Sequence, residues 1–119
     1  MAYDQNNIFA MILRGDISCE KIYEDEFALS FNDINAQAPV HALVIPKGDY
    51  VSMADFTANA PADLVAGFFR AVGETARQLE LEQDGYRLIA NTGDNAHQEV
   101  PHLHFHILSG KKLGPMLSR

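Results

Sequence analysis

Three histidines at alternate positions are the residues of this chain best suited to chemistry. His102, His104 and His106 stand at i, i+2 and i+4, and four of the five histidines fall within residues 97–106. Successive side chains of a β-strand point to opposite faces, so these three imidazoles would project from one face, about 6–7 Å apart per step. Imidazole titrates at about pH 6.5, so such a row can serve in proton transfer, nucleophilic attack or metal binding. The intervening apolar residues would face the core: Leu103, Phe105 and Ile107.

Three interpretations of this histidine row compete. It could be the solvated face of a half-exposed strand, although Thr, Lys or Glu would serve there without the cost of mutual protonation. Three imidazoles can also ligate zinc, but a structural zinc site usually adds a pair of cysteines, and Cys19 is the only cysteine. In the third interpretation a neutral ring attacks phosphorus while a protonated neighbour stabilises the oxyanions. We favour phosphate chemistry, with catalytic zinc as the open alternative.

The elements that must position these histidines follow from hydrophobic periodicity and turn residues. A first helix is predicted from a cap at Asn6-Asn7 to Gly15, and a stronger helix over residues 61–80. Short runs of apolar or alternating residues predict strands, two of them within residues 21–32 and the others at 41–45, 86–91 and 102–108. Strands joined by short turns pair antiparallel, so we expect an α+β fold with a mostly antiparallel five-stranded sheet and two helices. No linker is evident, which predicts one domain over residues 1–119 with a C-terminal tail at about 111–119.

The composition argues against several classes of protein. The 119 residues include 9 Lys+Arg and 16 Asp+Glu, a net charge of −7, which argues against a nucleic-acid polymer as partner. No segment approaches the ~20 apolar residues of a membrane span, and the first residues lack the pattern of a signal peptide. We therefore expect no membrane partner. A single cysteine permits no intrachain disulfide and is typical of a cytoplasmic protein.

The histidine row and its flanks resemble a known signature. Residues 98–108 read Gln-Glu-Val-Pro-His-Leu-His-Phe-His-Ile-Leu, similar to the alternating histidine and apolar residues of the histidine-triad (HIT) family. Residues 108–111 (Leu-Ser-Gly-Lys) and 114–117 (Gly-Pro-Met-Leu) resemble bacterial members of its Hint branch. The resemblance covers nearly the whole chain, with further matches at residues 31–34, 37–39, 41–47 and 85–91. It implies a HIT-like fold whose sheet is joined across a homodimer; the apolar tail residues Leu113, Met116 and Leu117 are compatible with such a contact.

The activity that this resemblance implies is hydrolysis of purine nucleoside 5′-phosphoramidates. Such enzymes cleave the P–N bond between a purine nucleoside monophosphate and an amine, and also act on aminoacyl adenylates. By resemblance, His104 would be the nucleophile that forms a nucleotidyl-histidine intermediate, and His106 would bind the phosphate oxygens. A backbone carbonyl on the far nitrogen of His104 would leave its attacking nitrogen free. His102 and His41 would support these two rings.

The same resemblance implies a set of substrate contacts, with neither a metal nor a cofactor. Asp33 would accept both ribose hydroxyls, although an aspartate before Ile34-Asn35 could equally be an ordinary turn residue. His41 alone could likewise be a hydrogen-bonded core histidine. The apolar residues expected to line the base pocket are Phe31, Ile34, Leu43, Ile8, Phe9 and Ile12. The residues expected at the phosphate and the leaving group are Asn91, Gln98, Glu99 and Val100.

Two residues depart from the family pattern, and three further functions remain as alternatives. His97 replaces a residue that is commonly glycine, and Glu99 replaces the Ser or Thr of animal relatives. An ionised carboxylate there would repel phosphate, so we expect its backbone N–H, or a contact with the leaving amine, to be what counts. The alternatives are a nucleotide-binding regulatory module with incidental hydrolysis and a dinucleoside polyphosphate hydrolase, although that branch usually shows Pro-Arg after the triad. A metal-dependent hydrolase that uses the histidine row as ligands is a third.

Overall fold

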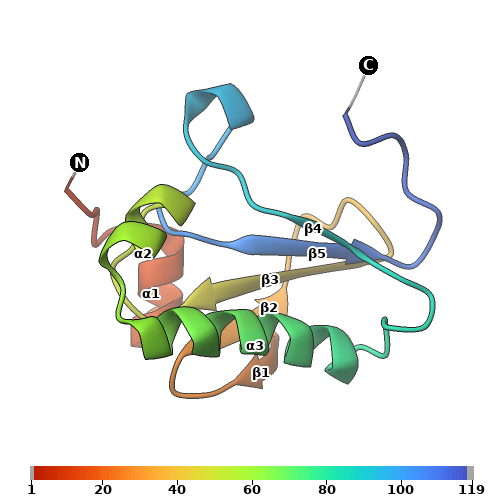
Figure 1. The fold of residues 1–119 in the computed structure, drawn as a ribbon, viewed down its shortest axis with the longest axis horizontal. Helices are drawn as coiled ribbons and strands as arrows, with labels where there is room; N and C mark the ends of the chain where they lie inside the picture. Colours follow the sequence, from red (N-terminus) through yellow and green to blue (C-terminus); the bar gives the residue numbers. More distant parts are fainter. Residues whose placement is uncertain (1, 118–119) are drawn as a thin grey trace.

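A computed structural model describes residues 2–117 of the chain. Its central feature is a five-stranded antiparallel sheet, as expected from the strand and turn pattern. The strand order is β1-β2-β3-β5-β4. The strands are β1 (Lys21–Glu24), β2 (Ala28–Asn32), β3 (Val40–Pro46), β4 (Arg87–Ile89) and β5 (Phe105–Ser109). The helices are α1 (Ile8–Arg14), α2 (Met53–Asn59) and α3 (Ala62–Gln78), with a 3₁₀ turn, η1, at Asp94–Ala96 (Figure 1). No helix among the described residues is long and apolar enough to span a membrane.

The sheet separates two hydrophobic clusters because alternate side chains of its central strands point to opposite faces. On one face, Ala42 and Val44 of β3 pack with Phe68 and Val72 of α3. On the other face, Leu43 and Ile45 of the same strand pack in a cluster that contains Phe9 of α1. The long helix α3 thus supports the sheet from behind, and α1 covers part of the opposite face. This second face carries the candidate site.

Helix α1 begins and ends where the sequence indicates. The side chain of Asn7 accepts a hydrogen bond from the N–H of Ala10 at 2.9 Å, and Gly15 closes the helix with a φ of 85°. A left-handed φ at this position suits glycine because it has no Cβ. The two caps place Phe9 in edge contact with Phe31 of β2, with ring centroids 5.7 Å apart.

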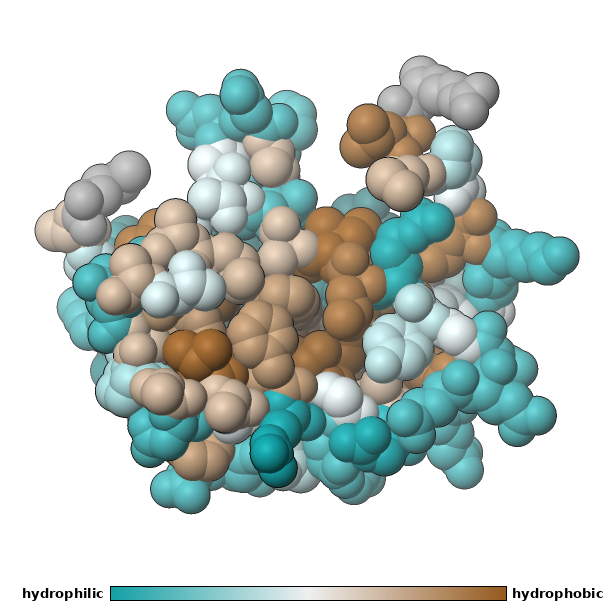
Figure 2. All heavy atoms as spheres, viewed as in Figure 1, coloured by the Kyte–Doolittle hydropathy of each residue, from teal (hydrophilic) through white to brown (hydrophobic). Residues whose placement is uncertain are grey.

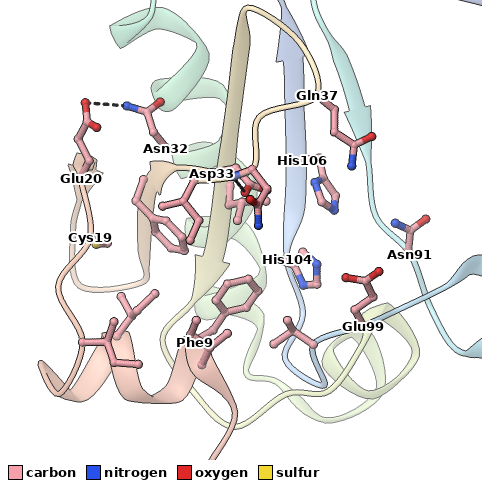
Figure 3. Close-up of a pocket in the computed structure, with 18 of the residues that line it drawn as sticks. Phe9, Cys19, Glu20, Asn32, Asp33, Gln37, Asn91, Glu99, His104 and His106 are labelled. Carbon is pink, nitrogen blue, oxygen red and sulfur yellow. Dashed lines mark hydrogen bonds between the residues drawn. The ribbon is translucent and has the colours of Figure 1, made fainter.

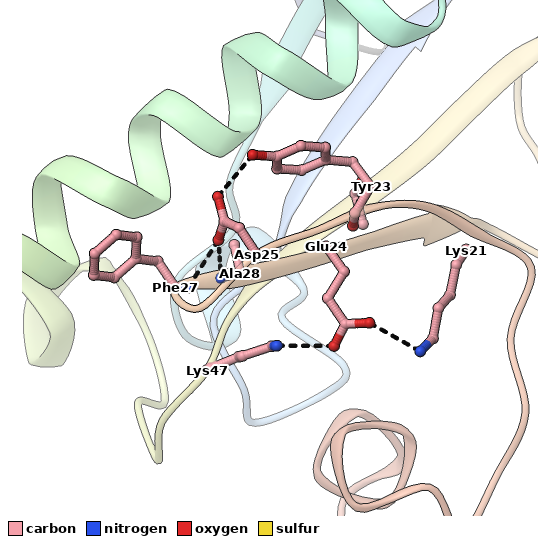
Figure 4. Close-up of polar contacts among 8 residues, drawn as sticks. Lys21, Tyr23, Glu24, Asp25, Phe27, Ala28 and Lys47 are labelled. Carbon is pink, nitrogen blue, oxygen red and sulfur yellow. Dashed lines mark hydrogen bonds and ion pairs between the residues drawn. The ribbon is translucent and has the colours of Figure 1, made fainter.

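The turn between β1 and β2 is held by one aspartate. Asp25 Oδ1 accepts the N–H groups of Phe27 and Ala28 at 2.8 and 3.0 Å, and its Oδ2 accepts the hydroxyl of Tyr23 (Figure 4). Beside it, Glu24 bridges Lys21 and Lys47. The ring of Phe27 lies so close to the backbone of α3 that a Cβ on Gly67 would clash with it. Glycine inside this helix therefore permits close packing against the turn.

Two sequence expectations about elements were wrong. We predicted two helices, and the structure has a third, α2, whose seven residues include Thr and Asn and bury only Phe56. These residues have weak helix propensity and form no apolar stripe, so no periodic signal marks the helix. The last strand begins at Phe105 rather than at His102. Pro101 has no N–H, and Leu103 N–H bonds to the carbonyl of Tyr50, so neither residue joins the ladder with β3.

Candidate active site

A cavity of about 470 Å³ lies on the α1 face of the sheet. One wall is apolar, and the far wall is the loop before β5 (Figure 3). Most of the residues expected from sequence line it: His104, His106, Asp33, Phe31, Ile34, Leu43, Ile8, Phe9, Ile12, Asn91, Glu99 and Val100. Three do not, namely His102, His41 and Gln98. Their contacts show what each does instead.

His104 is oriented by a bond to its own backbone segment. Its Nδ1 lies 2.7 Å from the carbonyl oxygen of His102, as expected for a ring held by a backbone carbonyl. A carbonyl can only accept, so Nδ1 carries the hydrogen and Nε2 keeps a free lone pair. His104 is 7% exposed, and its ring packs edge-on against Phe9, with ring centroids 4.9 Å apart. His104 therefore presents an unprotonated nitrogen as a potential nucleophile in the cavity.

His106 is oriented by a different chain of contacts that starts outside β5. The backbone N–H of Gln37 donates to His41 Nδ1 at 3.0 Å, so His41 carries its hydrogen on Nε2. That Nε2 lies 2.9 Å from His106 Nδ1, which must therefore accept. The hydrogen of a neutral His106 is then on Nε2, and this N–H is the donor that the residue can offer to a ligand. The ring centroids of His104 and His106 are 5.1 Å apart, so the ring that offers a lone pair and the ring that offers an N–H are neighbours.

Burial keeps all four of these imidazoles neutral. Desolvation lowers the pKa of His102 to about 4, and desolvation followed by the charges of His104 and His41 lowers the pKa of His106 to about 4. Desolvation also lowers the pKa of His104, against the opposing carboxylates of Asp33 and Glu99, and that of His41. Neighbouring rings were expected to hold different protonation states near neutral pH. In the free protein they do not, because desolvation acts on every ring.

His102 supports the site from behind. It is fully buried, and its Nε2 donates to the carbonyl of Pro46 at 3.0 Å. Its Nδ1 must then accept, and the partner is the hydroxyl of Tyr3. Tyr3 was missed by sequence reasoning, since it lies 99 positions from its partner and belongs to no motif.

Asp33 makes the turn contact considered for it and also lines the cavity, and its role toward ribose stays a prediction. Its Oδ1 accepts the N–H of Asn35 at 2.8 Å, which is the turn contact, and its Oδ2 lies 3.4 Å from His41 Nε2. The carboxylate still lines the cavity, between the apolar wall and the histidines (Figure 3). Ile34 lines the cavity but is 91% exposed, so it lies at the rim of the cavity and not in its interior.

Gln98 holds the loop in shape, although it was expected to contact phosphate. Its Oε1 accepts the N–H of Gly93, and its Nε2 donates to the carbonyls of Val51 and Val100. The adjacent His97 adopts a left-handed φ of 56° and lines the cavity from an exposed position. A left-handed conformation favours glycine, which fits the expectation that glycine is the common residue here.

Several lining residues were not expected. Most of them come from segments between the predicted strands and helices, and Asn32 is the last residue of β2: Ile17, Ser18, Cys19, Glu20, Asn32, Asn35, Gln37 and Ala96. His97, noted from the sequence only as a departure from the family pattern, lines the cavity as well. Cys19 is half-buried and lines the cavity.

One cluster of the described residues has the composition of a metal site. Asp33, His41 and His106 bring one potential ligand atom each within 4.8 Å of one another. The facing nitrogens of His41 and His106 share a hydrogen, however, so a metal would have to displace that proton. Function without a metal or cofactor stays a prediction.

Comparison with known proteins places these features in a family context. The model of the HIT domain family matches residues 14–113. A HIT-like protein of Azospirillum brasilense is 57% identical over 117 residues, covering 98% of this chain and 96% of the relative. The purine nucleoside phosphoramidase of Escherichia coli is 38% identical over 114 residues, covering 96% and 95%.

Solved structures of HIT proteins have the same fold as this chain. A histidine triad protein from Clostridium difficile has a TM-score of 0.84 at 39% identity, covering 98% of this chain and 100% of its own. A HIT family hydrolase from Clostridium thermocellum has a TM-score of 0.86 at 35% identity, covering 97% and 99%. The expected fold is therefore confirmed.

Proposed function

Since this chain belongs to the HIT domain family, we propose that it is a hydrolase that cleaves the P–N bond of purine nucleoside 5′-phosphoramidates. Aminoacyl adenylates, which present the same nucleoside phosphate, are a second substrate class. With a nucleotide substrate and a single free thiol, the cytoplasm is the proposed place of action.

The observation that carries the proposal is the pair of complementary nitrogens in the cavity. His104 Nε2 offers a lone pair, and His106 Nε2 offers an N–H, within two rings whose centroids are 5.1 Å apart. A phosphate between them would receive the attack of His104 while His106 donates to a phosphoryl oxygen. The geometry provides both groups without a charged side chain.

The proposed reaction has two steps. His104 Nε2 forms a bond to phosphorus as the P–N bond of the substrate breaks, and the amine leaves after its nitrogen takes a proton from solvent. Water then attacks the nucleotidyl-histidine and gives up one proton to solvent, the P–Nε2 bond breaks, and the nucleoside monophosphate leaves with His104 neutral again. Asp33 would accept the ribose hydroxyls, and the apolar wall with Phe9 and Phe31 would hold the base.

Hydrolysis of adenosine 5′-phosphoramidate by wild type and by His104→Ala tests this proposal. The variant should lose turnover on the order of 10³-fold or more, with AMP binding and the circular dichroism spectrum retained. Denaturing mass spectrometry after an alkaline quench should detect the nucleotidyl adduct in wild type alone. Full turnover in the variant would remove His104 as the nucleophile. Wild-type turnover far below one per minute, with tight nucleotide retention, would favour a regulatory binding module.

We further propose that the chain forms a homodimer through the β4 edge of the sheet. β4 pairs with β5 alone, and Leu88 at its centre is 44% exposed. Phe69 of α3 and Tyr86 beside β4 are also exposed, and Figure 2 shows apolar surface over this part of the molecule. An edge strand with apolar neighbours is suited to pairing with a second copy.

A further inference from the structure

The charges that line the cavity are unusual for a site that binds a phosphate. Its lining residues include the carboxylates of Glu20, Asp33 and Glu99 but neither Lys nor Arg. The lowered pKa values of His104 and His106 keep both rings neutral as well. The cavity is therefore negative before a ligand enters, and each further negative charge on a ligand meets repulsion without a fixed cation to offset it.

The carboxylates occupy different parts of the cavity. Glu20 accepts a hydrogen bond from the side-chain amide of Asn32 at 3.1 Å, on the side of the apolar wall. Asp33 is held by Asn35 and faces His41. Within residues 2–117, the carboxylate of Glu99 has neither a hydrogen bond nor an ion pair. It is exposed at the mouth of the cavity, where it and Asn91 lie on the opposite side of the two histidines from Asp33 (Figure 3).

The positions of these carboxylates suggest where each part of a substrate binds. With the ribose at Asp33 and the phosphate at His104 and His106, the remaining substituent of phosphorus extends toward Glu99. In a phosphoramidate that substituent is the amine. Resting on the function proposed above, we propose that Glu99 makes this site select phosphoramidates whose leaving amine carries an additional positive charge, and makes it disfavour polyphosphates.

The physical effect is an attraction across a partly solvated gap. An exposed ion pair contributes modestly, so a cationic amine should gain roughly two- to fivefold in kcat/KM at low salt over a neutral amine of the same length. An anionic amine should lose by a similar factor. Both effects should weaken as ionic strength rises. A polyphosphate chain would place several negative charges beside Glu99 and should be a poor substrate.

Three adenosine 5′-phosphoramidates of equal chain length test the proposal. Their amines are ethylenediamine (distal ammonium), propylamine (neutral) and β-alanine (distal carboxylate). Wild type should rank them in that order in kcat/KM. Glu99→Gln should bring the three values to within about twofold, by lowering kcat/KM for the cationic compound and raising it for the anionic compound by similar factors. Glu20→Gln is the matched control, since it removes a cavity carboxylate from the other side and should keep the ranking.

The outcomes separate the role of Glu99 from the proposed function. Equal rates for the three compounds in wild type, or an unchanged ranking in Glu99→Gln, would overturn the role of Glu99. Diadenosine tetraphosphate cleaved faster than the propylamine compound would also overturn it. If wild type cleaves none of the phosphoramidates, the proposed function fails. The dissociation constants of the same three compounds, measured by calorimetry, then test the charge selection by the same ranking.

Discussion

The Nδ1 atom of His104 lies 2.7 Å from the carbonyl oxygen of His102, two residues earlier in the chain. The orientation of the His104 ring therefore depends on how firmly the backbone of His102 is held in place. His102 is bonded at both ring nitrogens, to the carbonyl of Pro46 and to the hydroxyl of Tyr3. A line of contacts thus runs from residue 3 to the proposed nucleophile.

Removing the Tyr3 hydroxyl should impair catalysis from outside the cavity. In Tyr3→Phe, Nδ1 of the buried His102 loses its donor, so unfolding free energy should fall by about 1 kcal/mol and kcat by a few-fold, with KM little changed. Tyr23→Phe is the matched control, because its hydroxyl bonds Asp25 in a turn remote from the site. It should lose stability without loss of kcat. Equal kcat values in the two variants would contradict the prediction.

Acid should destabilise the protein through His102. Its folded pKa of about 4 lies below the ordinary value of 6.5, so the unfolded chain binds the proton first as pH falls. Stability is then complete above about pH 6.5 and declines between pH 6.5 and 4, by on the order of 2 kcal/mol from this residue between pH 7 and pH 5. Urea unfolding at these two pH values measures the loss. His102→Gln should show a shallower pH dependence, whereas an unchanged slope would assign the loss to other groups.

Phosphate binding should draw a proton into the site. Desolvation lowers the pKa of His104, whose Nε2 keeps a free lone pair, and a bound phosphate would favour its protonated form and raise its pKa. Calorimetric titration with AMP at pH 6 in buffers of different ionisation enthalpy should therefore show proton uptake that declines toward pH 8. The uptake should diminish in His104→Gln. Proton release on binding would show that the histidines respond differently.

Asp33 should accept hydrogen bonds from the ribose hydroxyls of the substrate. Asp33→Asn keeps an oxygen for the N–H of Asn35 but loses the charge and one acceptor. KM for the adenosine phosphoramidate should rise roughly tenfold, as expected for lost hydrogen bonds to a charged group. The 2′-deoxyadenosine compound should already be poor in wild type and change less in the variant. Equal effects on both substrates would place the role of Asp33 elsewhere, such as at His41.

The proposed homodimer should depend on Leu88. A glutamate at this position puts a charge in the centre of the β4 surface, so Leu88→Glu should be a monomer by sedimentation velocity at concentrations where wild type is a dimer. Leu117→Glu, which alters the exposed tail instead, distinguishes the two candidate surfaces. A monomeric wild type, or dissociation by the tail variant alone, would overturn the β4 assignment.

The alternation of residues 102–108 allowed much of the site to be predicted from sequence. His104 and His106 share the cavity with Asp33 as expected, although only His106 lies within β5 and His104 directly precedes it. The start of β5 was misplaced because Leu103 bonds to Tyr50, a contact that no local pattern reveals. The same limit applies to Tyr3, whose partner lies 99 residues away.

The protonation states of the histidines and the role of Gln98 could not be predicted from the sequence, for a different reason. Spacing shows that imidazoles are neighbours, whereas their pKa values depend on how much water is excluded around each ring. An amide beside a phosphate-binding motif can likewise face the ligand or the backbone. Gln98 bonds to three backbone groups of its own surroundings, and only the folded loop shows this choice.

The thiol of Cys19 can report whether a ligand occupies this cavity. It is the only cysteine of a chain that has no tryptophan, and it lines the same cavity as His104. Burial raises the pKa of its thiol, so alkylation at neutral pH should be slow enough to follow by simple sampling. A nucleotide in the cavity would shield the thiol, and the slowing of alkylation would measure occupancy without any turnover. Ligands that are never hydrolysed could be ranked in this way.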